Sequence, residues 1–174
     1  LVELYAHSAG RDTTMRIVEP VTSFILAAVV TDQPYLMSAR TLVSSRILLV
    51  PAALVREVVK DDPALMQATM RELAHAYRDM VRALTDMKLR QSAERLGNLI
   101  LRLDRRQGGT GSVLLKAEKR LLASLLGMTP ENLSRAFGVL TGHGITVSGP
   151  NVTITDRAAL EAFSRPDPVR DDLV

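Results

Sequence analysis

The residues around Gly127 constrain the fold of this chain more than any other feature. Apolar side chains at helical spacing lie on both sides of this glycine: Leu121, Leu122, Leu125, Leu133, Phe137 and Leu140. Two short helices packed across a tight turn produce this pattern, because glycine adopts a positive φ at little cost. Thr129 is placed to cap the second helix and Pro130 to occupy its first position. The segment therefore predicts a helix-turn-helix.

The outer face of the second predicted helix carries side chains suited to reading base pairs. Glu131, Ser134 and Arg135 follow the spacing i, i+3, i+4 and therefore share one face. Arginine makes a bidentate contact to guanine, glutamate accepts from cytosine, and serine is adaptable. A solvated amphipathic helix is the alternative. The predicted DNA-binding residues are Thr129, Glu131, Asn132, Ser134, Arg135, Lys116 and Lys119.

A β-hairpin is predicted directly after this helix. Residues 145–147 and 152–154 alternate apolar and polar side chains, and residues 148–151 between them read Ser-Gly-Pro-Asn, a turn composition. A hairpin at this place corresponds to the wing of a winged helix. The sequence therefore predicts a winged helix-turn-helix.

The charge of the chain supports contact with a polyanion. Residues 1–86 hold nine basic and ten acidic side chains, and residues 87–174 hold thirteen and nine. Nine basic residues precede the predicted recognition helix: Lys88, Arg90, Arg95, Arg102, Arg105, Arg106, Lys116, Lys119 and Arg120. We expect this cluster to contact phosphates, with a solvated helix face as the alternative for individual members.

With its wing, the segment from residue 113 to 163 resembles the DNA-binding domain of the Crp/Fnr family of bacterial transcription regulators. Glu131-x-x-Ser134-Arg135 matches the Fnr-type reading triplet, whereas the Crp-type pattern has an arginine where this chain has Pro130. The resemblance implies a transcription regulator that binds a TTGA-type inverted repeat in double-stranded DNA as a homodimer. RNA polymerase is a further partner if the protein is an activator.

A long helix is predicted from Pro63. Its apolar residues are spaced alternately four and three apart: Met66, Met70, Leu73, Tyr77, Met80, Leu84 and Met87. Such a heptad seam predicts a dimer interface. The alternative, a helix lying on its own domain, would normally show a broader apolar stripe. A second helix is predicted over residues 91–104, followed by a flexible link at residues 107–112.

The first sixty residues predict mainly strands. A strand, a turn at Ser8-Ala9-Gly10 and a second strand open the chain, a β-rich stretch ends at Val50, and a short helix starts at Pro51. The element order resembles the Crp/Fnr family over essentially the whole chain. We therefore expect an α+β fold with a partial cyclic-nucleotide-binding-like β-roll (residues 1–62), a dimerisation helix (63–90) and a winged helix-turn-helix domain (91–174). Family members usually carry further strands before the point matching Leu1, so the N-terminal part of the β-roll is expected to be missing.

The β-roll lacks the anchors for a cyclic nucleotide. Cyclic-nucleotide binders of the family have a Phe-Gly-Glu segment and an Arg-Ser or Arg-Thr pair, whereas the matching residues 24–26 and 35–37 read Phe-Ile-Leu and Tyr-Leu-Met. Burying a cyclic phosphate there without a counter-charge would cost several kcal/mol, so cAMP is disfavoured. The predicted effector pocket is apolar, with core packing as the alternative role of its residues: Ile25, Leu26, Val29, Tyr35, Leu36 and Met37.

The cofactor is left unknown by the sequence. The chain has no cysteine, which excludes disulfides and thiolate metal sites in it and disfavours an iron–sulfur cluster. The apolar lining resembles that of regulators of denitrification and nitrogen-oxide response, several of which are thought to sense nitric oxide through haem. Among the three histidines, His7, His75 and His143, we take His7 as the haem candidate.

The sequence offers no catalytic constellation, so we do not expect an enzyme. Asp61 and Asp62 precede Pro63, where helix capping explains them. Neither a membrane-spanning apolar run nor a signal peptide is found, and a cytoplasmic protein is expected. Two alternatives remain: a Crp-like regulator that responds to cAMP or another small ligand, and a dimeric sensor module that does not bind DNA.

Overall fold

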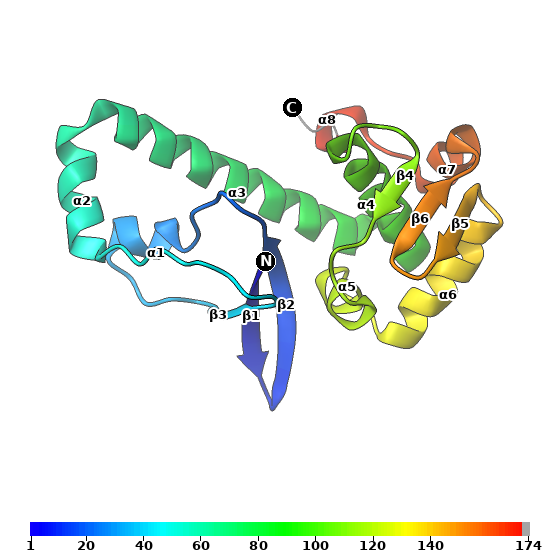
Figure 1. Cartoon of the computed structure of the whole chain (residues 1–174), viewed down its shortest axis with the longest axis horizontal. Coiled ribbons are helices and arrows are strands. Elements are labelled where there is room, and N and C mark those ends of the chain that lie inside the picture. Colours follow the sequence, from blue (N-terminus) through cyan, green and yellow to red (C-terminus); the bar gives the residue numbers. More distant parts are fainter. Residues whose placement is uncertain (172–174) are drawn as a thin grey trace. The chain divides into compact units, whose positions relative to one another are not determined.

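The computed structural model describes residues 1–171. These residues divide into two compact units, residues 1–80 and the part from residue 81 onward (Figure 1). The long helix α3 (Pro63–Leu89) continues from the first unit into the second. It begins where predicted, at Pro63, and Asp62 Oδ1 accepts hydrogen bonds from the Ala64 and Leu65 amides at its start. No helix among the described residues is long and apolar enough to cross a membrane.

The first unit is built on a small antiparallel sheet. Strands β1 (Val2–Ser8), β2 (Arg11–Val18) and β3 (Ser38–Thr41) are ordered β2-β1-β3, with β1 and β2 forming the predicted hairpin (Figure 1). Val2, Leu4 and Val18 form its buried core, against which Phe24 and Met37 pack. Two short helices, α1 (Leu26–Thr31) and α2 (Ala52–Asp61), contact each other.

The prediction of a strand that ends at Val50 is wrong. Residues 42–50 contain no strand, and the side chains of Leu48 and Leu49 are 87% and 86% exposed. A strand requires a partner for its backbone hydrogen bonds, and within the described residues the stretch 42–50 joins neither of the two sheets. The apolar composition of this stretch therefore did not translate into a strand.

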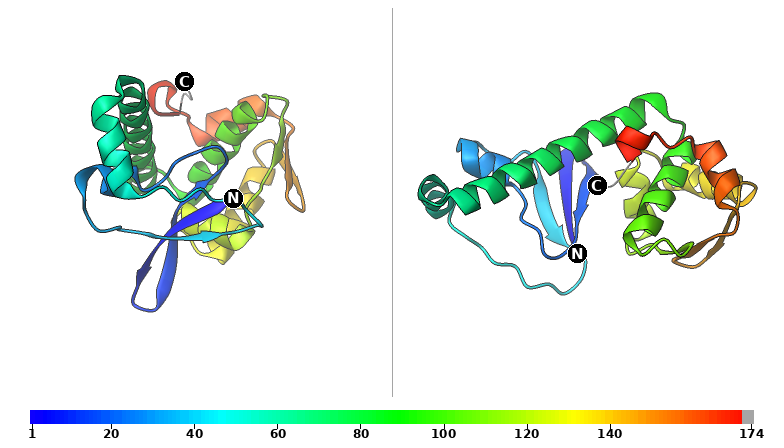
Figure 2. Two further views of the ribbon diagram at one scale, coloured as in Figure 1. Left: turned by 60° about the vertical axis from the view of Figure 1, so that its left-hand side comes forward. Right: turned by 90° about the horizontal axis from the view of Figure 1, so that it is seen from above.

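The second unit contains the predicted winged helix-turn-helix. Its helices and strands, shown in Figures 1 and 2, are α4 (Ser92–Arg106), β4 (Ser112–Leu114), α5 (Lys119–Leu125), α6 (Pro130–Thr141), β5 (Ile145–Ser148), β6 (Asn151–Ile154), α7 (Arg157–Ser164) and α8 (Pro168–Asp171). Residues from all these elements except α8 contribute to one apolar core, which includes Leu96, Ile100, Leu133, Leu140 and Leu160. The predicted α+β fold with antiparallel sheets is confirmed.

The wing has one strand more than the sequence predicted. β4 pairs with β6, so the sheet order is β4-β6-β5. The link before β4 is anchored, because Asp104, which is fully buried, accepts a hydrogen bond from the Gly111 amide at 2.7 Å. Gln107 bonds Leu114 through both its side-chain nitrogen and its side-chain oxygen. The flexible link expected at residues 107–112 is thus an ordered loop.

Candidate nucleic-acid interface

The turn between α5 and α6 has the features that the sequence predicted. Gly127 adopts a φ of 62°, and Pro130 starts α6. Thr129 caps the helix by accepting a hydrogen bond from the Asn132 amide at 3.2 Å. Leu133 and Phe137 are among the residues that bury the inner face of α6. The capped N-terminus of α6 is therefore fixed by its own sequence and by the core beneath it.

The opposite face of α6 exposes the three predicted reading residues. Glu131, Ser134 and Arg135 are all exposed, as is Asn132 beside them. The pKa of Glu131 is lowered by a hydrogen bond from its own backbone amide, by one from the Thr129 hydroxyl and by the charge of Arg135. Glu131 is consequently an ionised acceptor at neutral pH, as a contact to the amino group of cytosine requires.

Asn132 and Arg135 also border an open depression between α6 and the start of α4. It has a volume of about 420 Å³, and Gln91 and Ser92 form part of its other side. The N-terminal half of α6 is thus accessible both on its outer face and along this edge.

The basic cluster divides into two groups with different partners. Lys116 and Lys119 are exposed, and the Lys119 ammonium lies 5.6 Å from the centre of the Phe137 ring. Arg90, Arg95 and Arg102 instead form ion pairs or hydrogen bonds within the protein. Neither the expected phosphate contact nor the alternative of a solvated helix face describes these three arginines, because sequence spacing cannot reveal partners that are distant along the chain.

The dimer seam predicted on α3 lies on an open face of the helix. Six of its seven side chains are exposed and Leu73 is half-buried: Met66, Met70, Leu73, Tyr77, Met80, Leu84 and Met87. A different face of α3 carries the buried Thr69 and the half-buried Glu72 and Asp79. Most of the seam therefore lies outside the face that packs within the chain, except for the half-buried Leu73 and for Met87, which approaches Gly127.

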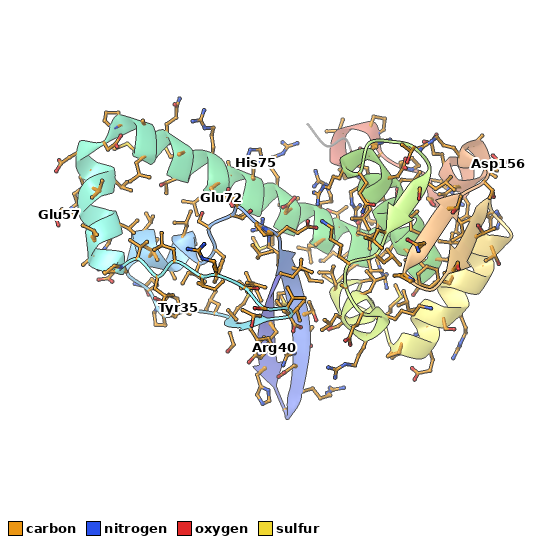
Figure 3. The ribbon with its side chains drawn as sticks, in the orientation of Figure 1. Tyr35, Arg40, Glu57, Glu72, His75 and Asp156 are labelled. Atoms are coloured by element: carbon orange, nitrogen blue, oxygen red, sulfur yellow. The ribbon has the colours of Figure 1, made fainter. Side chains whose placement is uncertain are left out.

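The residues predicted to form an effector pocket have different environments. Val29 is buried and Ile25, Leu26 and Met37 are half-buried, but Tyr35 and Leu36 are 60% and 91% exposed. Figure 3 shows Tyr35 on the segment before β3 and Arg40 on β3. The effector pocket stays a prediction. Tyr35 and Leu36 are too exposed in this structure to line an enclosed pocket.

Arg40, the basic side chain close to this stretch, is already paired. Its guanidinium donates to buried Glu3 at 2.6 Å and to Asp12 at 2.9 Å, and it stacks over Tyr5. Glu3 also accepts from Thr14 at 2.6 Å. These contacts support the prediction that Arg40 does not replace the missing phosphate anchor.

The histidines have surroundings that do not favour a haem. His7 lies at the end of the β1–β2 hairpin, its side chain is 62% exposed, and its Nδ1 lies 2.8 Å from Asp12. A hydrogen bond with His7, together with Arg40, lowers the pKa of Asp12. His143 stacks on Phe163 at 4.2 Å, and His75 is exposed on α3. Within the described residues no group of three or more side chains could hold a metal ion.

Comparison with known proteins assigns the second unit. Residues 94–163 match the family model described as the Crp-like helix-turn-helix domain. This part of the chain is a Crp-like helix-turn-helix domain. The match includes α6 with all three predicted reading residues, Glu131, Ser134 and Arg135.

Solved structures extend the likeness beyond the Crp-like domain. A regulatory protein from Silicibacter pomeroyi DSS-3, whose description proposes that it binds cAMP, is 26% identical, with a TM-score of 0.62 over 95% of this chain and 74% of that one. A CooA variant from Carboxydothermus hydrogenoformans is 16% identical, with a TM-score of 0.80 over 94% and 74%. A Crp/Fnr-family transcriptional regulator from Thermus thermophilus is 21% identical, with a TM-score of 0.69 over 95% and 84%. The Crp/Fnr architecture expected from the sequence is thereby confirmed. No curated protein matches the chain.

Proposed function

We propose that this protein is a homodimeric transcription regulator that reads a TTGA-type inverted repeat through α6. The observation that carries the proposal is the exposure of Glu131, Ser134 and Arg135 on one face of a capped helix in a Crp-like domain. In helix-turn-helix proteins this face enters the major groove. Arg135 would contact guanine, Glu131 cytosine, and Ser134 a neighbouring A·T pair.

Dimerisation through the α3 seam is part of the same proposal. An exposed apolar stripe at heptad spacing loses its contact with water when two copies pack along it. The methionines in the stripe suit a pliable interface because their side chains are flexible. Two-fold pairing would present two copies of α6 to half-sites about one helical turn apart, which is the spacing expected for dimeric helix-turn-helix proteins.

The test is fluorescence anisotropy with labelled duplexes. We expect the protein to bind a duplex with two inverted TTGA half-sites, and to lose most of this affinity when five base pairs are inserted between them. The insertion turns one half-site to the opposite face of the DNA while its sequence stays intact. Equal affinity for the repeat, the lengthened repeat and a scrambled duplex would contradict sequence-specific reading. Absence of binding to all three duplexes would support a sensor module that does not bind DNA.

An effector at the first unit would control the regulator by shifting its population between two states. We propose a small uncharged effector, such as nitric oxide, because the half-buried residues near α1 are apolar and Arg40 is paired with acidic side chains. Haem that senses nitric oxide remains the proposed cofactor; His7, its candidate ligand, is exposed and lies beside Asp12. Absorption spectra of the protein purified anaerobically, with and without haem and nitric oxide, test this part.

A further inference from the structure

The segment after α7 folds back onto the end of α3 and the middle of α4. Figure 2 shows α8 close to the corner between these helices. Asp171 is 2% exposed, and its carboxylate pairs with Arg90 at 2.5 Å and with Arg102 at 3.2 Å. The same carboxylate accepts a hydrogen bond from the Asp167 amide at 2.7 Å, which closes α8 into a compact turn. This segment lies outside the residues that match the Crp-like model.

Arg90 occupies the joint itself, between the last residue of α3 and the N-cap of α4. Its guanidinium also pairs with Asp86 at 2.5 Å, and Arg102 reaches Asp86 at 3.4 Å. Two carboxylates and two guanidiniums therefore alternate around one site, with all four side chains at most 13% exposed. Removing one carboxylate would leave a nearly buried guanidinium short of a counter-charge, which is strongly unfavourable.

Arg95 connects this joint to the helix-turn-helix. Its Nη1 donates to the Arg90 carbonyl oxygen at 2.7 Å, and its Nε donates to the Leu126 carbonyl oxygen at 3.0 Å. Leu126 is the C-cap residue that follows α5, and Gly127 comes next in the turn that leads to α6. Met87 of α3 covers this turn, because its Sδ would lie 3.2 Å from a Cβ added to Gly127. One arginine thus bonds the backbone of both the joint and the turn.

We propose that Asp171, Arg90 and Arg95 form a brace that holds the α3–α4 joint and the α5–α6 turn in one arrangement and so positions α6 for DNA. The consequence for DNA rests on the proposed function, but the rigidity of the two backbone segments does not. The brace residues are positioning residues, because they bond the elements that carry Glu131 and Arg135 and do not themselves lie on the reading face. When the brace is loosened, the reading side chains are still present. Helix α6 then samples orientations that do not match the major groove of DNA.

The experiment compares three variants of the full chain. Asp171→Asn removes the charge at the centre of the brace and keeps the size of the side chain. Arg95→Gln removes the bonds to the Arg90 and Leu126 carbonyl oxygens but spares the ion pairs that also hold the joint. Glu161→Gln is the matched control, because it neutralises a carboxylate of the same unit that pairs only with half-exposed Arg157 among the contacts seen. Amide hydrogen exchange without DNA is measured at residues 89–92 and 126–128. Affinity is then measured for the inverted repeat and for a scrambled duplex.

We expect Asp171→Asn to accelerate exchange at both segments and Arg95→Gln to do so mainly at residues 126–128, while Glu161→Gln behaves as the parent. Affinity for the inverted repeat should fall roughly 3- to 30-fold in the first two variants, the range typical of mutations that alter coupling between sites. Affinity for the scrambled duplex should stay constant, since phosphate contacts tolerate reorientation.

Two results would overturn the brace. Parent-like exchange at both segments in Asp171→Asn would show that the joint is held by other contacts, whether or not the protein binds DNA. Faster exchange with unchanged preference for the inverted repeat would show that the joint does not position α6. If the parent itself does not distinguish the two duplexes, the proposed function fails, and the exchange data still decide whether the brace exists. If Asp171→Asn does not fold, the brace is tested with Arg95→Gln alone, for which parent-like exchange at residues 126–128 would overturn the proposal.

Discussion

Single side chains on α6 divide into those that hold the helix and those that face solvent. Leu133 and Phe137 are buried in the core, and Thr129 caps the first turn. Glu131 and Arg135 are exposed and electrostatically coupled, since the charge of Arg135 contributes to the low pKa of Glu131. Their substitution should therefore alter recognition with little effect on folding.

Arg135→Ala should weaken binding to the inverted repeat by about 1 to 3 kcal/mol per half-site and relax the preference for guanine at one position, because a bidentate base contact is lost. Anisotropy with a panel of single-base variants measures this. Lys116→Ala and Lys119→Ala are the comparison, and should weaken all duplexes alike and make the salt dependence shallower. An equal loss of specific and nonspecific affinity in Arg135→Ala would identify Arg135 as a phosphate contact.

Gly144, at the start of the wing, is predicted to be intolerant of a side chain. Its φ is +88°, and an added Cβ would lie 2.2 Å from the carbonyl oxygen of Asp156. Gly144→Ala should lower the free energy of unfolding by at least about 2 kcal/mol. Gly138→Ala on α6 is the control, because a Cβ there meets nothing within 4 Å, and it should raise the stability by up to about 1 kcal/mol. Urea unfolding measures both, and similar values for the two variants would refute the steric argument.

Among the helices, α3 shows a clear difference between a face that is buried within the chain and a face that is exposed. Thr69 is buried within the chain, whereas Met70 and Tyr77 of the seam are 65% and 63% exposed. A helix of this kind can pack against its own unit with one face and against a second copy of the chain with another face. The exposed stripe is thus a feature of the element as a whole, beyond any single contact.

Replacing Leu73 and Met80 with glutamate should convert the proposed dimer to monomers. Burial of each side chain contributes about 1.5 to 3 kcal/mol, so the dissociation constant should rise at least about a hundredfold. Sedimentation equilibrium measures the change. The control replaces Ala68 and His75, exposed residues outside the seam, with glutamate and should leave the dimer intact. A dimer of unchanged affinity in the seam variant would contradict the assignment of the interface.

At the scale of the whole molecule, stability at low pH should depend on Asp171. Burial alone would raise its pKa, but hydrogen bonds from Arg90 and the Asp167 amide, with the charges of Arg90 and Arg102, hold the pKa below the ordinary value of 3.8. A depressed pKa stabilises the folded state above the unfolded pKa, and this contribution is lost as pH falls through the folded pKa. Asp171→Asn should therefore be less stable than the parent by about 1.5 to 3 kcal/mol at pH 7, with the difference closing below about pH 4. Urea unfolding across this range measures it, and a difference independent of pH would exclude the charge as its cause.

The intact protein should not bind cAMP in the low micromolar range. Ile25 and Leu26 stand where a carboxylate is needed, and Arg40 is bonded to Glu3 and Asp12. Binding would therefore remove the cyclic phosphate from water without a counter-charge, which is unfavourable. Titration calorimetry with cAMP, and with 5′-AMP as the control, measures this. A low micromolar dissociation constant for cAMP alone would reverse the expectation.

The sequence by itself determined the features that local chemistry controls. The turn at Gly127, the cap at Thr129, the start of α6 at Pro130 and the hairpin of the wing follow from residues that are neighbours in the chain. Helical spacing likewise separated Leu133, which is buried, from the exposed face that carries Glu131, Ser134 and Arg135. Periodicity and turn composition suffice for such features because the interacting residues are at most a few positions apart.

Only the tertiary structure decided which charged groups meet and which apolar stretches find a partner. Asp171 reaches Arg90 across more than eighty positions of sequence, so a basic residue that suggested a phosphate contact proved to be half of an ion pair. Leu48 and Leu49 had strand composition but no neighbouring strand, and they remained exposed. Ion pairs and strand pairing both depend on long-range proximity, which residue type does not encode locally.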